Sequence, residues 1–239
     1  MMFGANVPIP PLLAKRKRDR RGYPIPYITY IDRHKKPQFT VNNGKMVKRC
    51  ILHNRCGLCG EKMPETVWFV GGPGAALHDS GAFIDPPMHK ECATYALQVC
   101  PFIAFKPYKG EKDTYVLDGI QQNGLEGTVI KVDEQAEAMK GKPSVFCLVG
   151  TTKFRNMGDY NAPRLVRGEL VDIEFWKDGK RLSPVKDEEL ILELINIDLE
   201  KVDKIVEEEK AKRTIPYTGP LGGLALNSPG SYILSTIRR

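Results

Sequence analysis

The 239-residue chain contains no apolar run that approaches the roughly 18 residues needed to cross a bilayer. The apolar segment 1–11 precedes the basic stretch, which is the opposite of the order in a signal peptide. Hydrophobic residues make up 41% of the chain and charged residues 27%, as is ordinary for a globular protein. We therefore expect an intracellular, cytoplasmic protein, in the host cytoplasm if a phage encodes it, without a membrane partner.

The six cysteines could form three disulfides, as in a secreted protein, but a chain of this length can bury an apolar core without them. Their spacing instead indicates metal. Cys56 and Cys59 are separated by two residues, and so are His89 and Cys92, after 29 intervening residues. Gly60 favours a tight turn at the first pair, and the second pair lies one turn apart at the start of a predicted helix. We predict that Cys56, Cys59, His89 and Cys92 bind a structural Zn²⁺.

Other ligand sets remain open at this stage. Cys50, Cys100 or His53 is able to replace one of the four, and Cys100 in place of His89 would suit an iron–sulfur cluster. A catalytic zinc is disfavoured, because such a site keeps one position for water and three thiolates would make that water a poor acid. Cys147 lies in an apolar segment, where we expect an inert, buried thiol.

The order of elements around the cysteines predicts an α+β protein with a treble-clef-like zinc module. Segments 27–31 and 38–41 are expected as a strand pair and 46–53 as a helix. After the Cys56–Gly60 turn we expect a hairpin of strands 66–70 and 82–84 joined by the glycines at 71–74, and then a helix over 88–100.

The second half of the chain predicts a mixed α/β portion. Strands are expected at 114–117, 127–132, 145–149 and 170–176, followed by an Asp-Gly turn at 178–179. Two amphipathic C-terminal helices are expected, one opening at Ser183 and one near Asp198. The resulting division is a basic flexible arm (1–22), the zinc module (23–110), the mixed α/β portion (111–213) and a flexible tail (214–239).

The net charge of +7 is distributed unevenly. Residues 1–55 contain 13 Lys and Arg against two acids, whereas acids outnumber bases by four in the rest. Basic side chains near Tyr23, Tyr27 and Tyr30 suit phosphate contacts and base stacking, although a solvated arm is an equal alternative. The candidate nucleic-acid-binding residues are Lys15, Arg16, Lys17, Arg18, Arg20 and Arg21.

Several segments together resemble an uncharacterised family of bacterial and phage-encoded proteins. They are 21–27, the Cys-x2-Cys-Gly turn at 56–60, Pro-Pro-x-His-x-x-Cys-Ala at 86–93 continuing to Cys-Pro-Phe at 100–102, 168–170 and 175–180. The resemblance spans most of residues 21–210. It supports the zinc-ligand assignment and marks Cys100-Pro101 as a family feature, but it implies no activity. The basic arm and the tail lie outside it.

We therefore expect a zinc-stabilised protein that acts by binding nucleic acid or a partner protein rather than by catalysis. The competing hypothesis is a metal-dependent nuclease of the His-Asn-His type, which shares the treble-clef scaffold. Here the hairpin region offers only His78-Asp79, in reversed order, and segment 79–88 contains no Asn. A third hypothesis is an interaction protein that modulates host machinery.

Overall fold

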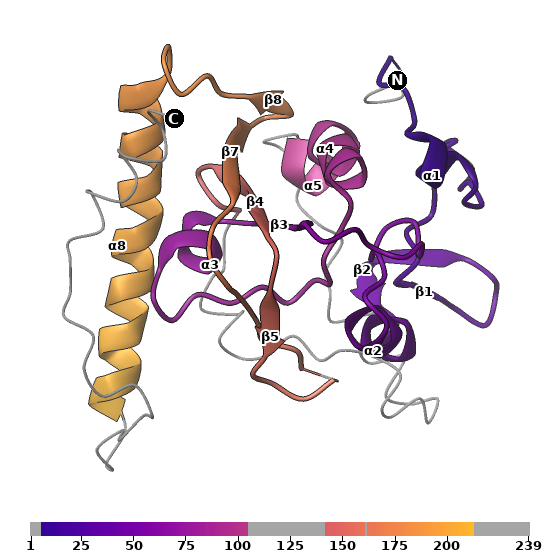
Figure 1. The fold of residues 1–239 in the computed structure, drawn as a ribbon, viewed down its shortest axis with the longest axis horizontal. Helices are drawn as coiled ribbons and strands as arrows, with labels where there is room; N and C mark the ends of the chain where they lie inside the picture. Colours follow the sequence, from indigo (N-terminus) through magenta and orange to yellow (C-terminus); the bar gives the residue numbers. More distant parts are fainter. Residues whose placement is uncertain (1–5, 105–141, 161, 213–239) are drawn as a thin grey trace.

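The computed structural model describes residues 6–104, 142–160 and 162–212, and they form an α+β fold with small antiparallel sheets (Figure 1). The helices are α1 (Pro11–Ala14), α2 (Gly44–Leu52), α3 (Pro73–Leu77), α4 (Lys90–Val99), α5 (Pro101–Ala104) and α8 (Glu188–Lys212). The strands are β1 (Thr29–Ile31), β2 (Pro37–Asn42), β3 (Val67–Gly71), β4 (Phe146–Thr151), β5 (Phe154–Asn156), β6 (Leu165–Arg167), β7 (Asp172–Lys177) and β8 (Lys180–Arg181). The predicted strands 114–117 and 127–132 and the predicted tail 214–239 lie outside the described residues.

The largest sheet has the strand order β3-β4-β7-β8, and all of its pairs are antiparallel. All six residues of β4 are buried, because the strand lies between two neighbours and is covered on both faces. Long helix α8 runs along one side of this sheet, and the N-terminal elements lie on the opposite side (Figure 1). The sheet takes strands from both sides of the predicted boundary at 110, and the division into modules stays a prediction.

Several local elements agree with the sequence pattern. Strands β1 and β2 pair antiparallel, as expected for 27–31 and 38–41. Helix α2 begins where Asn43 accepts a hydrogen bond from the backbone N–H of Met46 through its side chain at 3.2 Å, a regular N-cap. The Asp178-Gly179 turn between β7 and β8 is also confirmed, with positive φ angles of 49° and 76°.

The expected hairpin after the cysteine turn is wrong. Strand β3 pairs along its length with β4, whereas Phe83 in the expected return strand bonds Leu165. Among the described residues that follow β3 up to α4, Met88 alone pairs with β3, in a single bridge to Trp68. The glycines at 71–74 do not form a hairpin turn, because Pro73 suits the first position of helix α3. A treble-clef fold is therefore not confirmed.

The two expected C-terminal helices are one continuous helix, α8, of 25 residues. Asp198, where the second helix was expected to begin, is 7% exposed inside α8. Its carboxylate accepts hydrogen bonds from the backbone N–H and the hydroxyl of Ser144 at 2.7 and 2.9 Å. This long-range partner satisfies the acid without a break in the helix. Ser183 lies in a turn before the helix, where its hydroxyl accepts from the N–H of Lys186.

Residues 6–22 pack against the body and thus differ from the expected flexible arm. Leu13 of α1 is only 3% exposed and belongs to the main apolar core. Arg18 pairs with Pro24 in a β-bridge, and the Arg16 guanidinium donates through Nε to the carbonyl of Ile25 at 3.0 Å. The basic residues are therefore held on a folded segment.

The burial of α8 predicts a difference between two isoleucines on the same helix. Ile195 is 0% exposed, whereas Ile197 is 38% exposed. We expect Ile195→Ala to lower the free energy of unfolding by about 2–5 kcal/mol, because it leaves a cavity against the sheet. Ile197→Ala is the matched control and should change it by less than about 1 kcal/mol. Denaturant unfolding measures both, and equal losses would contradict the docking of α8 through Ile195.

Candidate metal centre

The turn that contains the first cysteine pair is closed by backbone hydrogen bonds. The N–H of Gly60 donates to the carbonyl of Cys56 and the N–H of Cys56 to that of Glu61, both at 2.9 Å. Gly60 has φ +82°, and a Cβ atom there would lie 2.5 Å from the ring of Tyr27. Both the backbone conformation and the lack of space therefore require glycine at this position.

The second pair of ligands comes from the start of α4. His89 is the N-cap of this helix and Cys92 lies in its first turn, so that both side chains project to the same side. Backbone contacts fix the residues before the helix on two elements. Met88 exchanges hydrogen bonds with Trp68 of β3 at 2.8 and 3.0 Å, and the N–H of Gly57 in the cysteine turn donates to the carbonyl of Pro87 at 2.9 Å.

Cys56, Cys59, His89 and Cys92 form a buried cluster whose ligand atoms all lie within 4.8 Å of one another. His89 directs Nδ1 at the sulfurs, 3.3 Å from Sγ of Cys59 and 4.0 Å from Sγ of Cys92. Its Nε2 lies 3.0 Å from the carbonyl of Lys62. A carbonyl only accepts, so Nε2 carries a proton, and in the neutral imidazole the Nδ1 lone pair faces the sulfurs. This arrangement of donors could hold a metal ion such as zinc.

Backbone donors also point at the sulfurs. The N–H of Cys59 lies 3.5 Å from Sγ of Cys56, and the N–H of Glu61 lies 3.4 Å from Sγ of Cys59. Hydrogen bonds of this kind favour the thiolate form. Sequence reasoning missed the role of Lys62, because its contribution is a backbone carbonyl that no side-chain pattern reveals.

The ionisation of the three thiols is strongly linked. Hydrogen bonds from Cys59 and Cys92 lower the pKa of Cys56 well below its ordinary value. The hydrogen bond to Cys56 raises the pKa of Cys59 to about 11, and the same partner raises the pKa of Cys92. Hydrogen bonding to Cys56 also raises the pKa of His89. The protein groups alone thus favour one thiolate, and a divalent cation is what this donor set needs for all three to ionise.

The remaining cysteines do not join the cluster. Cys50 is buried on α2, with its Sγ 3.9 Å from the carbonyl of Cys56, and burial raises its pKa to about 12. Cys100 is the C-cap of α4, at the opposite end of the helix from His89. Cys147 is fully buried on β4, and burial raises its pKa. Among the described residues, the cluster that could hold a metal excludes Cys50, Cys100 and Cys147, and it also excludes His53.

The other predicted residues lie on different parts of the structure. His78 follows α3 and contacts Ser80 at 2.7 Å and Asp203 of α8 at 3.2 Å, so it belongs to the contact between α3 and α8. Among the six basic residues, Arg16 and Arg21 hold contacts within the protein. Five of the six are exposed, namely Lys15, Lys17, Arg18, Arg20 and Arg21, and Arg16 is half-buried.

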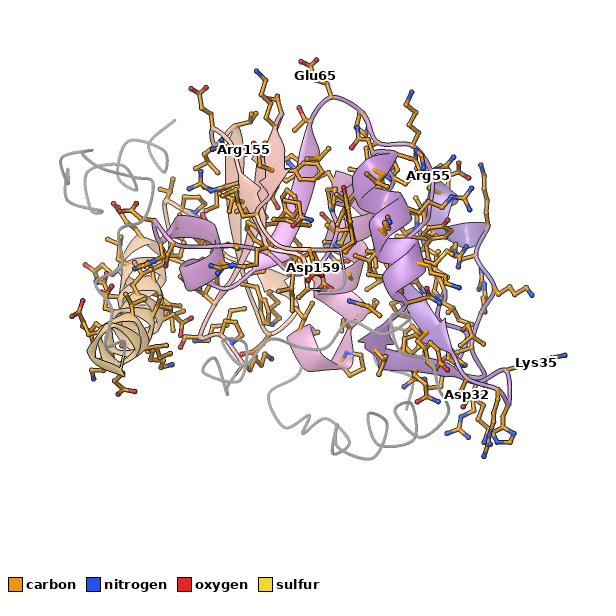
Figure 2. All side chains as sticks on the ribbon, turned by 90° about the horizontal axis from the view of Figure 1, so that it is seen from below. Asp32, Lys35, Arg55, Glu65, Arg155 and Asp159 are labelled. Atoms are coloured by element: carbon orange, nitrogen blue, oxygen red, sulfur yellow. The ribbon has the colours of Figure 1, made fainter. Side chains whose placement is uncertain are left out.

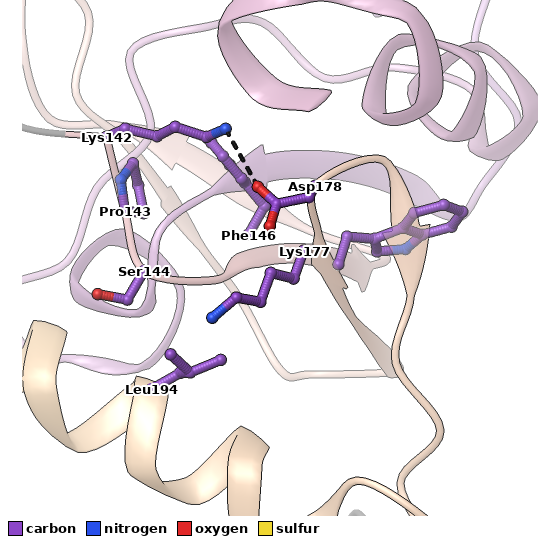
Figure 3. Close-up of a pocket in the computed structure, with 8 residues that line it drawn as sticks. Lys142, Pro143, Ser144, Phe146, Lys177, Asp178 and Leu194 are labelled. Carbon is purple, nitrogen blue, oxygen red and sulfur yellow. Dashed lines mark ion pairs between the residues drawn. The ribbon is translucent and has the colours of Figure 1, made fainter. Parts of the chain in front are cut away.

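A cavity of about 250 Å³ lies between the sheet and α8 (Figure 3). Several of its polar side chains contact other groups of the protein, although the buried Nζ of Lys142 has no hydrogen-bond partner among the described residues. Lys142 forms an ion pair with Asp178 at 3.8 Å, Ser144 bonds Asp198, and Trp176 donates through Nε1 to Glu174 at 3.2 Å. The cavity therefore offers less defined chemistry than the cysteine–histidine cluster.

No family model, curated protein or solved structure matches the chain. No family is therefore assigned, and the resemblance to an uncharacterised bacterial and phage family stays a prediction. Within residues 6–104, 142–160 and 162–212, no helix combines the length and apolar character needed to cross a membrane.

The geometry predicts that cysteine substitutions separate into two classes. Cys59→Ser and Cys92→Ser should reduce bound zinc to well below one equivalent and lower the thermal transition, because each removes a thiolate from the cluster. Cys50→Ser is the matched control, since this thiol is buried nearby but lies outside the cluster. Metal content by mass spectrometry and thermal unfolding test this. Full zinc occupancy in both ligand variants would contradict the assignment.

The thiol pKa values predict proton release when zinc binds. At pH 7 the raised pKa values of Cys59 and Cys92 keep both thiols protonated until the cation displaces their protons. Zinc should therefore release about two protons per ion from these thiols, together with any proton held on Nδ1 of His89, and its affinity should fall as the pH is lowered. Calorimetric titration in buffers of different ionisation enthalpy measures the proton count. A count of zero would show that these thiols are not ligands.

Proposed function

We propose that the cluster of Cys56, Cys59, His89 and Cys92 binds a structural zinc ion, and that the protein binds nucleic acid without catalysis. Four protein donors fill the tetrahedral shell of zinc and leave no position for a substrate or water. All four residues are at most 8% exposed, which suits a structural rather than a catalytic ion. A site of this kind contributes on the order of 10 kcal/mol to the folding of a small domain.

The distribution of charge is the observation that carries the nucleic-acid proposal. The first 55 residues hold the basic excess, and their elements lie on one side of the molecule. Figure 2 places Lys35 and Arg55 on the side opposite α8. Helix α8 is rich in acids, with Glu188 and Glu189 already in its first turn. A basic face of this kind attracts a polyanion, and the acidic side repels it.

The metal centre is linked directly to this basic side. The N–H groups of Tyr27 and Ile28 donate to the carbonyls of Leu58 and Gly57, at 2.8 and 3.2 Å. The guanidinium of Arg16 lies over the ring of Tyr27, 5.4 Å from its centroid. Zinc would thus fix the turn on which the basic segment rests, so that loss of metal should also disturb the basic face.

The proposal predicts a strong, salt-dependent affinity for nucleic acid that depends on the N-terminal lysines and arginines. The double substitution Lys17→Glu and Arg20→Glu should weaken binding and make its dependence on salt shallower by about one unit of slope per lost phosphate contact. The matched control is Lys186→Glu with Lys204→Glu, which makes the same change in net charge. Lys186 lies just before α8 and Lys204 lies in it. Fluorescence anisotropy over a range of salt concentrations measures both. Equal effects of the two double variants would contradict the basic face.

The nuclease hypothesis is tested in the same samples. Binding without strand cleavage in Mg²⁺ or Mn²⁺ supports the proposal, because the buried cluster has no open metal position. Cleavage that is lost on His78→Ala would instead support a nuclease with its site between α3 and α8.

A further inference from the structure

Arg21, Tyr23 and Phe39 form a stack on the N-terminal side of the molecule, which we call the stacking face. The guanidinium of Arg21 lies 5.4 Å from the ring centroid of Tyr23 and 5.3 Å from that of Phe39. The residues come from separate parts of the chain, because Phe39 belongs to β2 and the other two to the turn after α1. Cation–π contacts of this type orient a guanidinium plane along an aromatic ring.

Asp19 fixes the position of the guanidinium. Its carboxylate accepts from Nε of Arg21 at 2.7 Å and from the backbone N–H groups of Arg21 and Tyr23 at 2.9 and 3.0 Å. The Asp19 side chain is only 5% exposed, so this turn is well packed. The stack is therefore preorganised and does not have to be assembled when a ligand arrives.

The ring of Phe39 is the unusual member, because the residue is 43% exposed although phenylalanine is ordinarily buried. Tyr30 of the adjacent strand, by contrast, is 8% exposed and contributes to the core. The tyrosines near the basic segment were the expected stacking residues, yet Phe39 is exposed, whereas Tyr23 and Tyr27 are half-buried. Sequence reasoning missed it, since a phenylalanine in a strand ordinarily indicates a core position.

Exposed lysines and arginines lie in both chain segments that contribute to the stack. Lys17, Arg18 and Arg20 lie in the segment that carries Arg21. Arg33, Lys35 and Lys36 lie at the tip of the β1–β2 hairpin, and Figure 2 shows Lys35 pointing away from the body. An exposed aromatic ring whose neighbouring chain segments carry several cations matches a ligand with flat apolar rings and a repeated negative charge.

We propose that the stacking face binds single-stranded nucleic acid, with a base stacked on Phe39 and the adjacent phosphates contacted by the neighbouring lysines and arginines. This inference rests on the proposed function and deepens it. A duplex hides the faces of its bases, so it would contact the cations but not the ring. The side chain of Arg21 supplies a second planar surface beside Phe39.

The test compares a labelled single-stranded thymine oligonucleotide with a duplex of the same length. Phe39→Ala should weaken binding of the single strand about fivefold or more, the equivalent of one lost base stack, and leave duplex binding unchanged. Phe39→Tyr retains the ring and should keep the affinity. Ile84→Ala is the matched control, because Ile84 is 45% exposed and apolar but outside the stack. It should have no effect on either ligand.

Photocrosslinking of the unaltered protein supplies a second readout that does not depend on the folding of a variant. An oligonucleotide with 5-iodouracil should crosslink to the peptide that contains Phe39, as identified by mass spectrometry. Binding of both ligands with no effect of Phe39→Ala and no such crosslink would overturn the stacking inference but leave the nucleic-acid proposal standing. Failure to bind either ligand would overturn both.

Discussion

The contact between the Cys56–Gly60 turn and the first turn of α4 determines where the N-terminal elements lie. On one side of it, the backbone of Leu58 and Gly57 accepts the hydrogen bonds that hold Tyr27 and Ile28 before β1. On the other side, Gly57 donates to Pro87 just before His89. Three thiols and an imidazole occupy the centre of this contact. Apolar packing does not explain such a buried polar cluster, but a bound cation does.

Helix α4 is also fixed from the side of the large sheet. Lys90, the residue after His89, lies over the ring of Trp68 at 4.3 Å and pairs with the buried carboxylate of Glu174 at 3.0 Å. Leu97, farther along the helix, is fully buried in the main core. One helix therefore joins the metal centre to β3 and β7. A change in the centre should reach the sheet through this helix, whereas α8 docks through its own apolar face.

The sequence predicted local features well and long-range partners poorly. Helices α2 and α4 and the Asp178-Gly179 turn each depend on residues close together in the chain, so spacing alone reveals them. The two pairs of predicted ligands are each local as well, and the structure gathers these four residues in one buried cluster. The partner of β3 is β4, separated from it by more than 70 residues, and an apolar strand pattern does not specify its neighbour. The continuity of α8 depends on Ser144, which satisfies Asp198 from another element. The exposure of Phe39 likewise depends on which other elements pack against β2, and the local sequence does not specify them.

A metal ion with three sulfur ligands and one nitrogen ligand is proposed to join the cysteine turn to α4. X-ray absorption spectroscopy of the purified protein at the zinc edge is the decisive measurement. We expect three Zn–S distances of about 2.3 Å and one Zn–N distance of about 2.0 Å. A folded protein that contains no metal, or a metal surrounded only by oxygen and nitrogen, would contradict it.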